Sequence, residues 1–481
     1  MNLLEIKKIH FIGIGGIGIS ATARLARDRG IIVSGSDAQI SEVVDDLRSL
    51  GLDVKVPQRA ENVPTDADLA VYTVAAPEAN PERMRVKELG IEQMTYPQFL
   101  QLLLADKFGI SVSGTNGKTT TTAMIAKILI DADKDPSVVL GAKADFLSGN
   151  ARSGRGEYFV FESDEYRRAF DNYYPQIAAV TYIGEDHLDY YKDLAEIKSA
   201  FGNYLSHVPA EGYAVLNADD PNSMELAPKL KANKVTFGIT GEADYKAVIL
   251  NGSPLTDGRS EESQVLTLDP SALPQDDKNR QTFSVTERGR SLGQFSLLLP
   301  GRYNVYNALC AIAVCRTLGI DVEIIRQSLA GFTGTWRRFE RLGRLGQAEV
   351  IADYAHTPDA VAQVISATKE FYPGKKILIV FQPHQYSRTK NLFNKFVTAF
   401  GSAEQVIIPD IFYVAGREKP EDFAVDSKIL AEAIAAQGVR TLYGGSLAES
   451  EKLIRMLADD FDVILILGAG DVYELAKNLV K

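Results

Sequence analysis

Twice along the chain, an apolar segment runs directly into a glycine-rich turn and then into a helical segment. The first copy places GIGGIG, at 13–18, between a strand predicted over 9–12 and a helix predicted over 17–29. The second copy places GTNGKTT, at 114–120, between a strand predicted over 109–112 and a helix over 123–130. A strand, a tight turn and a helix in this order are typical of parallel sheets, so we predict an α/β protein.

The length of 481 residues is too great for one ordinary core and suggests about three domains. We predict a Rossmann-like domain over 1–106, a central P-loop-type ATPase α/β domain over 107–330, and a C-terminal Rossmann-like domain over 331–481. Short alternating segments between 243 and 299, such as QVLTLD and GQFSLLLPG, predict antiparallel strands appended to the central sheet, with a solvated loop at 256–263. Strands of the third domain are predicted at 349–352, 376–381, 405–408 and 463–467.

The composition excludes several classes of protein. A formal net charge of −11 argues against a general nucleic-acid binder, which needs a basic surface. Cys310 and Cys315 lie on one predicted helix and read as small core residues in a reducing compartment. No apolar stretch approaches the roughly 18 residues of a membrane helix, and the N-terminus reads as a first strand. We therefore expect a cytoplasmic protein with no membrane partner.

The first glycine loop predicts a phosphate site. Gly13, Gly15 and Gly18 form GxGxxG, which lets backbone N–H groups approach a phosphate at the start of a helix. Asp37 follows the second predicted strand, where a carboxylate can accept a hydrogen bond from a ribose hydroxyl. The motif does not distinguish NAD from another diphosphate nucleotide, and a tight turn without a ligand is the alternative.

The second loop predicts a triphosphate site. Backbone donors and the helix dipole can hold phosphates, Lys118 can neutralise the β- and γ-phosphates, and the Thr119 hydroxyl can reach Mg²⁺. Val112 stands where the standard motif has its first glycine, so the loop is a shortened variant. The alternative is a lysine that merely begins a helix.

Polar residues follow two further strands. Glu162 ends the apolar segment 158–161, where a carboxylate near a phosphate loop suits Mg²⁺. Asp164 and Glu165 come next and are expected to face water. His187 follows the strand predicted over 178–183; because imidazole is an unusual ligand for Mg²⁺, this residue alone favours an orienting or capping role.

Taken in order, these blocks resemble the Mur ligases over essentially the whole chain, and most nearly the members that add alanine. GIGGIG is similar to the uridine-nucleotide loop of the family, and GTNGKTTTT to its ATP loop. FESDEY and GEDHLDYY resemble its two metal motifs, which raises His187 to a metal or active-site ligand. The resemblance implies a UDP-sugar site at Gly13, Gly15, Gly16, Gly18 and Asp37, and an ATP site at Gly114, Thr115, Asn116, Gly117, Lys118, Thr119 and Thr120.

Further blocks carry the resemblance to the C-terminal part of the chain. The resemblance places Asn304 and Asn307, in PGRYNVYNALCAIAV, near the adenine of ATP. It also implies that Arg338, in GTWRRFERLG, and Asp353, in ADYAHTPDA, bind ATP. FQPHQYSRTKNLF, which contains His384 and Arg388, is similar to the block that holds the incoming amino acid. Amino-acid contacts are expected at these two residues and at His356 of ADYAHTPDA; a structural hydrogen-bonding role is the alternative for either histidine. The expected catalytic residues are Lys118, Glu162, His187, Arg338 and Asp353.

The activity implied is the ATP-dependent, ADP-forming ligation of L-alanine to UDP-N-acetylmuramate through an acyl phosphate, in peptidoglycan precursor synthesis. Two Mg²⁺ ions are expected, one with Thr119 and Glu162 and one near His187. The chain is expected to be a monomer or homodimer. Lys198 is the nearest candidate for a carbamylated lysine, but its spacing from His187 is short and no role is assigned.

Three departures bear on the amino acid. Gln385 follows His384 where the family usually has arginine, ADYAHTPDA looks more like the diaminopimelate- or lysine-adding members, and FESDEY has features of the murein tripeptide ligases. A Mur-type ligase that adds another amino acid or a peptide is therefore the alternative. A dehydrogenase would leave the GKT loop unexplained. A plain ATPase or kinase stays an alternative that amine-independent ATP turnover would support. The joint presence of the five expected catalytic residues argues against an inactive nucleotide-binding scaffold.

Overall fold

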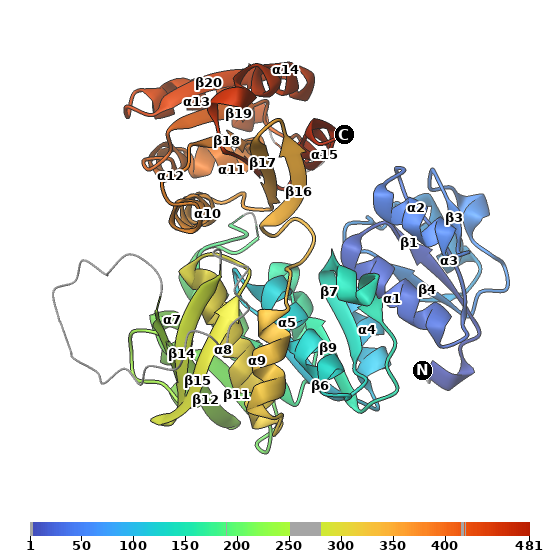
Figure 1. Cartoon of the computed structure of the whole chain (residues 1–481). Coiled ribbons are helices and arrows are strands. Elements are labelled where there is room, and N and C mark those ends of the chain that lie inside the picture. Colours follow the sequence, from blue (N-terminus) through green and yellow to red (C-terminus); the bar gives the residue numbers. More distant parts are fainter. Residues whose placement is uncertain (1–2, 189, 251–279, 415–417, 419) are drawn as a thin grey trace. The chain divides into compact units, whose positions relative to one another are not determined.

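The computed structural model describes residues 3–188, 190–250, 280–414, 418 and 420–481 (Figure 1). In these residues the strands form a five-stranded, a ten-stranded and a six-stranded sheet, which confirms the predicted α/β class. The chain divides into two compact units, and each is described by itself. The first comprises 1–248, 284–295 and 306–332, and the second 249–283, 296–305 and 333–481. The boundaries proposed near 106 and 330 stay predictions.

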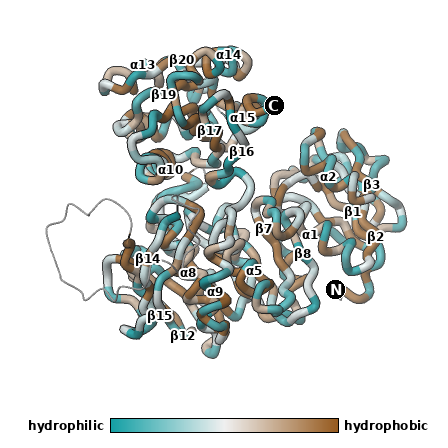
Figure 2. Tube along the Cα trace, viewed as in Figure 1, coloured by the Kyte–Doolittle hydropathy of each residue, from teal (hydrophilic) through white to brown (hydrophobic). Residues whose placement is uncertain are grey.

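The first sheet has the order β3-β2-β1-β4-β5, and its paired strands are parallel. Its hydrophobic stretches can be followed along β1 and β2 in Figure 2. Phe11 of β1 lies opposite Gly35 and Val71, so the end of β1 that carries the glycine loop is flanked by β2 and β4. The elements are β1 (Lys8–Ile12), α1 (Ile17–Asp28), β2 (Ile32–Ser36), α2 (Glu42–Ser49), β3 (Asp53–Lys55), β4 (Leu69–Tyr72), α3 (Pro81–Glu88), β5 (Glu92–Thr95) and α4 (Tyr96–Leu104).

A buried carboxylate joins several of these elements. Glu82, at the start of α3, is fully buried and accepts hydrogen bonds from the Ser36 hydroxyl, the Asn62 amide (2.7 Å) and the Arg59 backbone N–H (3.0 Å). The His10 ring nitrogen Nε2 lies 3.4 Å from the same carboxylate. Burial alone would raise the pKa of Glu82, but its hydrogen bonds, chiefly from His10 and Ser36, lower the pKa overall.

Replacing Glu82 by alanine is expected to lower the free energy of unfolding by about 3 kcal/mol, because several buried donors lose their acceptor. Urea denaturation at neutral pH measures the loss. Since the folded pKa is lowered, this stabilisation is present above the ordinary glutamate pKa and is lost as pH falls through the lowered value. Glu88→Ala on the same helix is the matched control, because Glu88 is exposed and pairs at the surface with Arg85. Equal losses in the two variants would contradict the expectation.

The ten-stranded sheet has the order β15-β14-β13-β12-β11-β10-β6-β9-β7-β8. Strand β6 lies between β10 and β9, and its parallel pairs bring the loops after these three strands to one edge. The strands are β6 (Phe108–Ser113), β7 (Ser137–Ala144), β8 (Gly149–Arg152), β9 (Tyr158–Glu162), β10 (Ile177–Val180), β11 (Tyr213–Asn217), β12 (Asn233–Gly238), β13 (Tyr245–Ile249), β14 (Gln281–Glu287) and β15 (Arg290–Leu297). The helices are α5 (Lys118–Asp131), α6 (Leu194–Ser206), α7 (Pro221–Leu226), α8 (Arg302–Thr317) and α9 (Val322–Ala330).

The appendage predicted over 243–299 is part of this sheet, with one correction. Strand β13 pairs with β12 in parallel, not antiparallel, with Phe237 opposite Tyr245 and Gly238 opposite Lys246. Strands β14 and β15 form a hairpin whose two turn residues, Arg288 and Gly289, have φ of 48° and 81°, as tight hairpin turns require. The predicted loop at 256–263 and the segment QVLTLD at 264–269 lie outside the described residues.

Within the first unit, the β7–β8 hairpin packs against α1 and α2. Lys143 of β7 donates to Glu42 (2.7 Å) and pairs with Asp46 (2.5 Å), both on α2. Asn150 of β8 donates to the Ile17 carbonyl at 2.6 Å. These contacts join the helix that follows the first glycine loop to the sheet that carries the second.

The six-stranded sheet has the order β16-β17-β21-β18-β19-β20, with β16 antiparallel to β17 and the remaining pairs parallel. The strands are β16 (Glu340–Leu345), β17 (Ala348–Asp353), β18 (Ile377–Phe381), β19 (Gln405–Pro409), β20 (Arg440–Gly445) and β21 (Val463–Leu467). The helices are α10 (Pro358–Phe371), α11 (Tyr386–Asn391), α12 (Phe393–Ala399), α13 (Ser427–Ala435), α14 (Leu447–Leu457) and α15 (Val472–Leu479).

Two further expectations concern the helices. Cys310 and Cys315 are buried on α8 as free thiols, as predicted, and burial raises the pKa of both. Among the described helices, none combines the length and the apolar character that crossing a membrane would require.

Candidate active site

The second glycine loop requires glycine at two positions. Gly114 has φ of 135°, and Gly117 caps the N-terminus of α5 with φ of 87°. A Cβ on Gly114 would clash with the Thr181 hydroxyl, and one on Gly117 would clash with the amide oxygen of Asn307. The loop therefore closes tightly against the end of β10 and against α8, leaving the first N–H groups of α5 unpaired by the helix itself.

Hydrogen bonds tie this loop to the segment that follows β10. The Thr115 N–H donates to the Tyr182 carbonyl (2.8 Å), and the Gly184 N–H donates to the Thr115 hydroxyl (2.8 Å). The Thr181 hydroxyl donates to the Asn116 carbonyl. The segment that carries His187 is thereby held next to the phosphate loop.

Lys118 is buried in an ion pair. Its Nζ donates to the Gly114 carbonyl (2.6 Å) and to both Glu165 oxygens (3.0 and 2.8 Å), and the two side chains are 18% and 3% exposed. Burial alone would lower the pKa of Lys118, but Glu165 and then Asp164 raise it overall. The ammonium is therefore charged at neutral pH.

Glu165 corrects the sequence analysis, which predicted that it faces water. Strand β9 ends at Glu162, and the following residues fold back into η4 (Tyr166–Asn172), two short 3₁₀ pieces joined by a kink at Arg167 and Arg168. This fold-back leaves Glu165 buried, with its carboxylate against Lys118. The Tyr191 hydroxyl donates to the Glu165 carbonyl at 2.5 Å and fixes this turn. The sequence did contain a signal for this position. A lysine that is buried in a phosphate loop needs a negative partner, and the carboxylates of FESDEY could supply one.

Glu162 and Thr119 come together as predicted. The Thr119 hydroxyl donates to Glu162 Oε2 at 2.9 Å, and the Gly141 N–H of β7 donates to Oε1. A Cβ on Gly141 would lie 2.7 Å from Oε2, so this strand approaches the carboxylate closely. A hydroxyl and a carboxylate offer the oxygen ligands that Mg²⁺ prefers.

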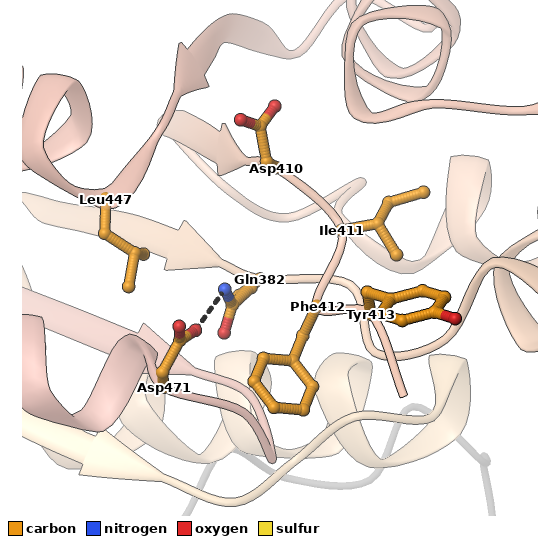
Figure 3. Close-up of a pocket in the computed structure, with 7 residues that line it drawn as sticks. All are labelled: Gln382, Asp410, Ile411, Phe412, Tyr413, Leu447 and Asp471. Carbon is orange, nitrogen blue, oxygen red and sulfur yellow. Dashed lines mark hydrogen bonds between the residues drawn. The ribbon is translucent and has the colours of Figure 1, made fainter. Parts of the chain in front are cut away.

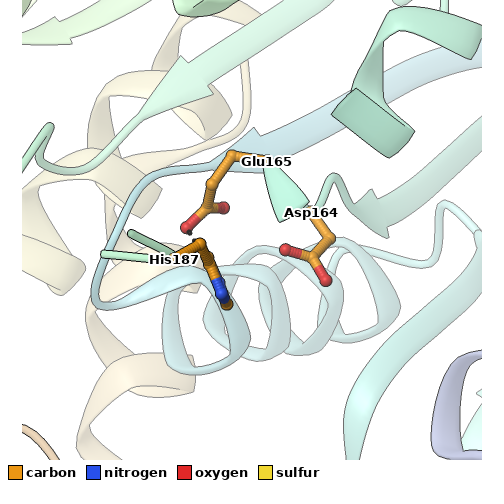
Figure 4. Close-up of side chains that lie close together, drawn as sticks. All are labelled: Asp164, Glu165 and His187. Carbon is orange, nitrogen blue, oxygen red and sulfur yellow. Dashed lines mark ion pairs between the residues drawn. The ribbon is translucent and has the colours of Figure 1, made fainter. Parts of the chain in front are cut away.

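A second cluster of possible metal ligands consists of Asp164, Glu165 and His187, whose ligand atoms lie within 4.8 Å of one another. Figure 4 shows the three side chains close together. His187 Nε2 lies 4.0 Å from Glu165 Oε1, its ring packs 4.6 Å from that of Tyr166, and its φ is 54°. The imidazole and the two carboxylates together offer nitrogen and oxygen ligands, so a divalent cation could be held here.

The first glycine loop is preformed by its own sheet. The Gly13 and Ile14 N–H groups donate to the Ser36 carbonyl (both 2.9 Å), and the Gly15 N–H donates to Asp37 Oδ2 (2.8 Å). Helix α1 begins after Gly16, with no side chain capping its N-terminus. Asp37 thus orders the loop; its contact with a ribose stays a prediction.

In the second unit, Asp353 and Arg338 lie near each other. Asp353 is buried and accepts the Phe339 and Ala355 N–H groups, each at 2.8 Å. Burial raises the pKa of Asp353, and the charge of Arg338 opposes that rise. The Arg338 guanidinium lies over the Tyr354 ring at 4.9 Å.

The asparagines predicted near the adenine occupy α8. The Asn304 amide donates to the Pro300 carbonyl at 2.7 Å, and the Thr121 hydroxyl donates to Asn307 at 3.3 Å. Asn307 therefore touches the helix that the phosphate loop begins. Lys198 instead pairs with Glu225 at 2.6 Å.

The three residues predicted to meet the amino acid gather in the second unit. The His384 ring stacks on Phe412 at 5.2 Å, its Nδ1 lies 3.3 Å from Arg388 Nη1, and its ring centroid lies 5.9 Å from that of His356. Gln385, the departure from the family pattern, is buried with φ of 72°, and its N–H donates to the Phe412 carbonyl.

A cavity of about 320 Å³ adjoins this group (Figure 3). Its lining comes from the loops after β18, β19 and β21 and from the start of α14, so it lies at the carboxyl ends of parallel strands. Gln382 donates to Asp471 across it at 2.7 Å. The lining residues are Gln382, Asp410, Ile411, Phe412, Tyr413, Leu447 and Asp471. The sequence analysis named none of them individually as a site residue.

Comparisons with known proteins agree with this geometry. Family models match in three consecutive stretches: "Mur ligase family, catalytic domain" over 8–108, "Mur ligase middle domain" over 112–315 and "Mur ligase, glutamate ligase domain" over 337–470. A UDP-N-acetylmuramate–L-alanine ligase of Caldanaerobacter subterraneus is 37% identical over 100% of this chain and 99% of its own. A protein of the same name from Clostridium acetobutylicum is 37% identical over 99% of this chain and 98% of its own.

Solved structures extend the likeness. The UDP-N-acetylmuramate-alanine ligase of Thermotoga maritima superposes with a TM-score of 0.81 at 30% identity, covering 98% of both chains. A murein peptide ligase of Psychrobacter arcticus gives a TM-score of 0.68 at 22% identity over 98% of both chains, which shows a shared fold. With full-length relatives above 30% identity and all three family models in order, the chain belongs to the Mur ligase family.

Proposed function

We propose that this chain is an ATP-dependent, ADP-forming ligase that joins L-alanine to UDP-N-acetylmuramate, in peptidoglycan precursor synthesis. The observation that carries the proposal is the match over the whole chain to relatives of that name. The pairing of Lys118 with Glu165 and of Thr119 with Glu162 supports it, because both pairs border one phosphate loop.

The phosphate loop binds and orients the nucleotide. Its backbone N–H groups and the N-terminus of α5 hold the β- and γ-phosphates of ATP, and the Lys118 ammonium neutralises charge on the transferred phosphoryl group. A carboxylate oxygen of UDP-N-acetylmuramate attacks the γ-phosphorus and ADP leaves, giving an acyl phosphate. The amino group of L-alanine then attacks the acyl carbon, phosphate leaves, and the amine loses a proton as the amide forms.

The donor sets fit two magnesium ions. Thr119 and Glu162 offer oxygens for one, and Glu165 with His187 and Asp164 offer ligands for the other. If bound there, such ions would supply positive charge that offsets the negative charge of the phosphates and of the substrate carboxylate. The contributions of Arg338, Asp353, Asn304 and Asn307 to ATP binding, and of Gly13–Gly18 with Asp37 to UDP-sugar binding, stay predictions.

The amino acid is proposed to lie against His384 and Arg388. The guanidinium suits the substrate carboxylate, and His356 and His384 can orient the amine. A second candidate, the addition of a larger amino acid, is favoured by two features: Gln385 replaces the usual arginine, and the adjoining cavity of about 320 Å³ exceeds the needs of a methyl side chain.

Phosphate release tests the proposed function and the choice of amino acid together. UDP-N-acetylmuramate and Mg-ATP are supplied with a panel that contains L-alanine, glycine, L-serine, L-lysine, diaminopimelate and the tripeptide. Turnover is expected only when both the acid and L-alanine are present, with product mass confirming the amide. Amine-independent phosphate release would overturn the ligase, and turnover with another member of the panel alone would select the second candidate.

Replacing Arg388 by lysine is expected to raise KM for the amino acid about 10-fold or more, since lysine keeps the charge but loses the paired donors of the guanidinium. KM for ATP and for UDP-N-acetylmuramate serve as internal controls and are expected to stay constant. Steady-state kinetics with each substrate varied in turn provides all three values. An unchanged KM for the amino acid would remove Arg388 from its site.

A further inference from the structure

Two consecutive arginines follow the first metal motif in an unusual backbone conformation. Arg167 and Arg168 have φ of 50° and 56°, in the left-handed region that residues other than glycine rarely adopt. Such conformations are unfavourable for residues other than glycine and persist where surrounding structure imposes them, often at ligand sites. Both residues lie in η4, directly after the Glu165 that pairs with Lys118.

The two arginines differ in their partners. Arg168 pairs with Asp171 at 3.7 Å, and its N–H donates to the Glu165 carbonyl, so it serves the turn itself. Arg167 is exposed, donates to the Val74 carbonyl at 3.3 Å and lies 5.5 Å from the centroid of the Tyr166 ring. In the described part of the chain, no carboxylate lies within ion-pair distance of Arg167. A guanidinium has five N–H donors, so most of its capacity to bind an anion is unused.

Arg167 lies between the two predicted ligand sites, the first glycine loop and the phosphate loop. Val74 follows Thr73, whose side chain occupies the place where a Cβ on Gly13 would fall. The Arg167 guanidinium is therefore close to the first glycine loop, while its backbone is two residues from Glu165. Both contacts lie within the first unit.

A tyrosine supports the same adjacency independently. A Cβ on Gly18 would lie 3.1 Å from the Tyr96 ring, which places that ring against the first glycine loop. Burial, together with the charges of Asp164 and Glu162, raises the pKa of Tyr96. The glycine loop and the metal-motif carboxylates thus border one region, and an acid carried on a nucleotide-linked sugar would have to cross it to reach the phosphate loop.

We propose that Arg167 binds an oxyanion of the sugar nucleotide, on the diphosphate or on the acid arm, and positions that arm toward Lys118. The proposal rests on the proposed function. Arg167 would add a positive charge to the backbone donors of the glycine loop.

The two arginines provide a matched test, because Arg167→Met and Arg168→Met remove the same charge from the same backbone conformation. Calorimetric titration with UDP-N-acetylmuramate in the absence of ATP is expected to show Kd raised about 10- to 100-fold in R167M. R168M is expected to bind nearly as the natural chain does. KM for ATP and for the amino acid is expected to be constant in both variants, and R167K should recover part of the affinity.

Two further ligands locate the oxyanion. If UDP and UDP-N-acetylglucosamine lose affinity in R167M as much as UDP-N-acetylmuramate does, Arg167 binds the diphosphate; a loss confined to UDP-N-acetylmuramate places it on the carboxylate. Equal affinities of R167M and R168M for all three ligands would overturn the role of Arg167. Failure of the natural chain to bind UDP-N-acetylmuramate would instead overturn the proposed function itself.

Discussion

Replacing Lys118 by methionine is expected to lower kcat by about 10³-fold, because the charge that stabilises the transferred phosphoryl group is lost while the length of the side chain is nearly kept. The same change leaves Glu165 buried, at 3% exposure, without the ammonium that lies 2.8 Å away. The free energy of unfolding is therefore expected to fall as well, by about 3 kcal/mol. Phosphate release measures the first effect and urea denaturation the second.

The double variant K118M/E165Q separates the two effects. A neutral glutamine at 165 needs no counter-charge, so most of the lost stability is expected to return while turnover stays abolished. Retention of the natural kcat in K118M would remove this lysine from the reaction. Unchanged stability in K118M would show that the pair with Glu165 contributes nothing to the folded state.

Replacing Glu165 by glutamine is expected to lower kcat by about 10²-fold and to raise the magnesium concentration for half-maximal activity about 10-fold. The substitution is nearly isosteric, yet it removes the charge that faces both Lys118 and His187, whose Nε2 lies 4.0 Å from Glu165 Oε1. Initial rates over a titration with magnesium chloride at saturating ATP give both values.

Glu185→Gln is the matched control, since Glu185 is an exposed carboxylate two residues before His187. It is expected to change neither value appreciably. If the magnesium dependence of E165Q equalled that of E185Q, Glu165 would be only a structural partner of Lys118. If both variants lost activity alike, the effect would reflect the general negative charge of the region.

The fold class and the tight glycine-rich turns could be predicted because their signals are local. Gly114 and Gly117 stand at backbone conformations that favour glycine, and a strand, turn and helix leave a short, contiguous pattern. Glu162 was placed correctly for the same reason, since it ends a strand next to the loop. In each of these cases the residues that determine the geometry lie within a few positions of each other.

The predictions from sequence failed for features that depend on segments far apart in the chain. Glu165 was expected in water because its neighbours are polar, but the fold-back of η4 and the partner Lys118, 47 positions earlier, bury it. The parallel pairing of β13 depends on which edge the chain joins after β12, and no local pattern records that choice. The cavity after β18, β19 and β21 is formed by three loops that only the sheet order brings together.

The central claim is that the groups around Lys118 hold a γ-phosphate for attack by the sugar-linked carboxylate. UDP-N-acetylmuramate labelled with ¹⁸O in that carboxylate, turned over with Mg-ATP and L-alanine, tests it by mass spectrometry of the released phosphate. Transfer through an acyl phosphate predicts one ¹⁸O atom in each phosphate, with ADP as the other product. Unlabelled phosphate, or the formation of AMP and pyrophosphate, would contradict the account.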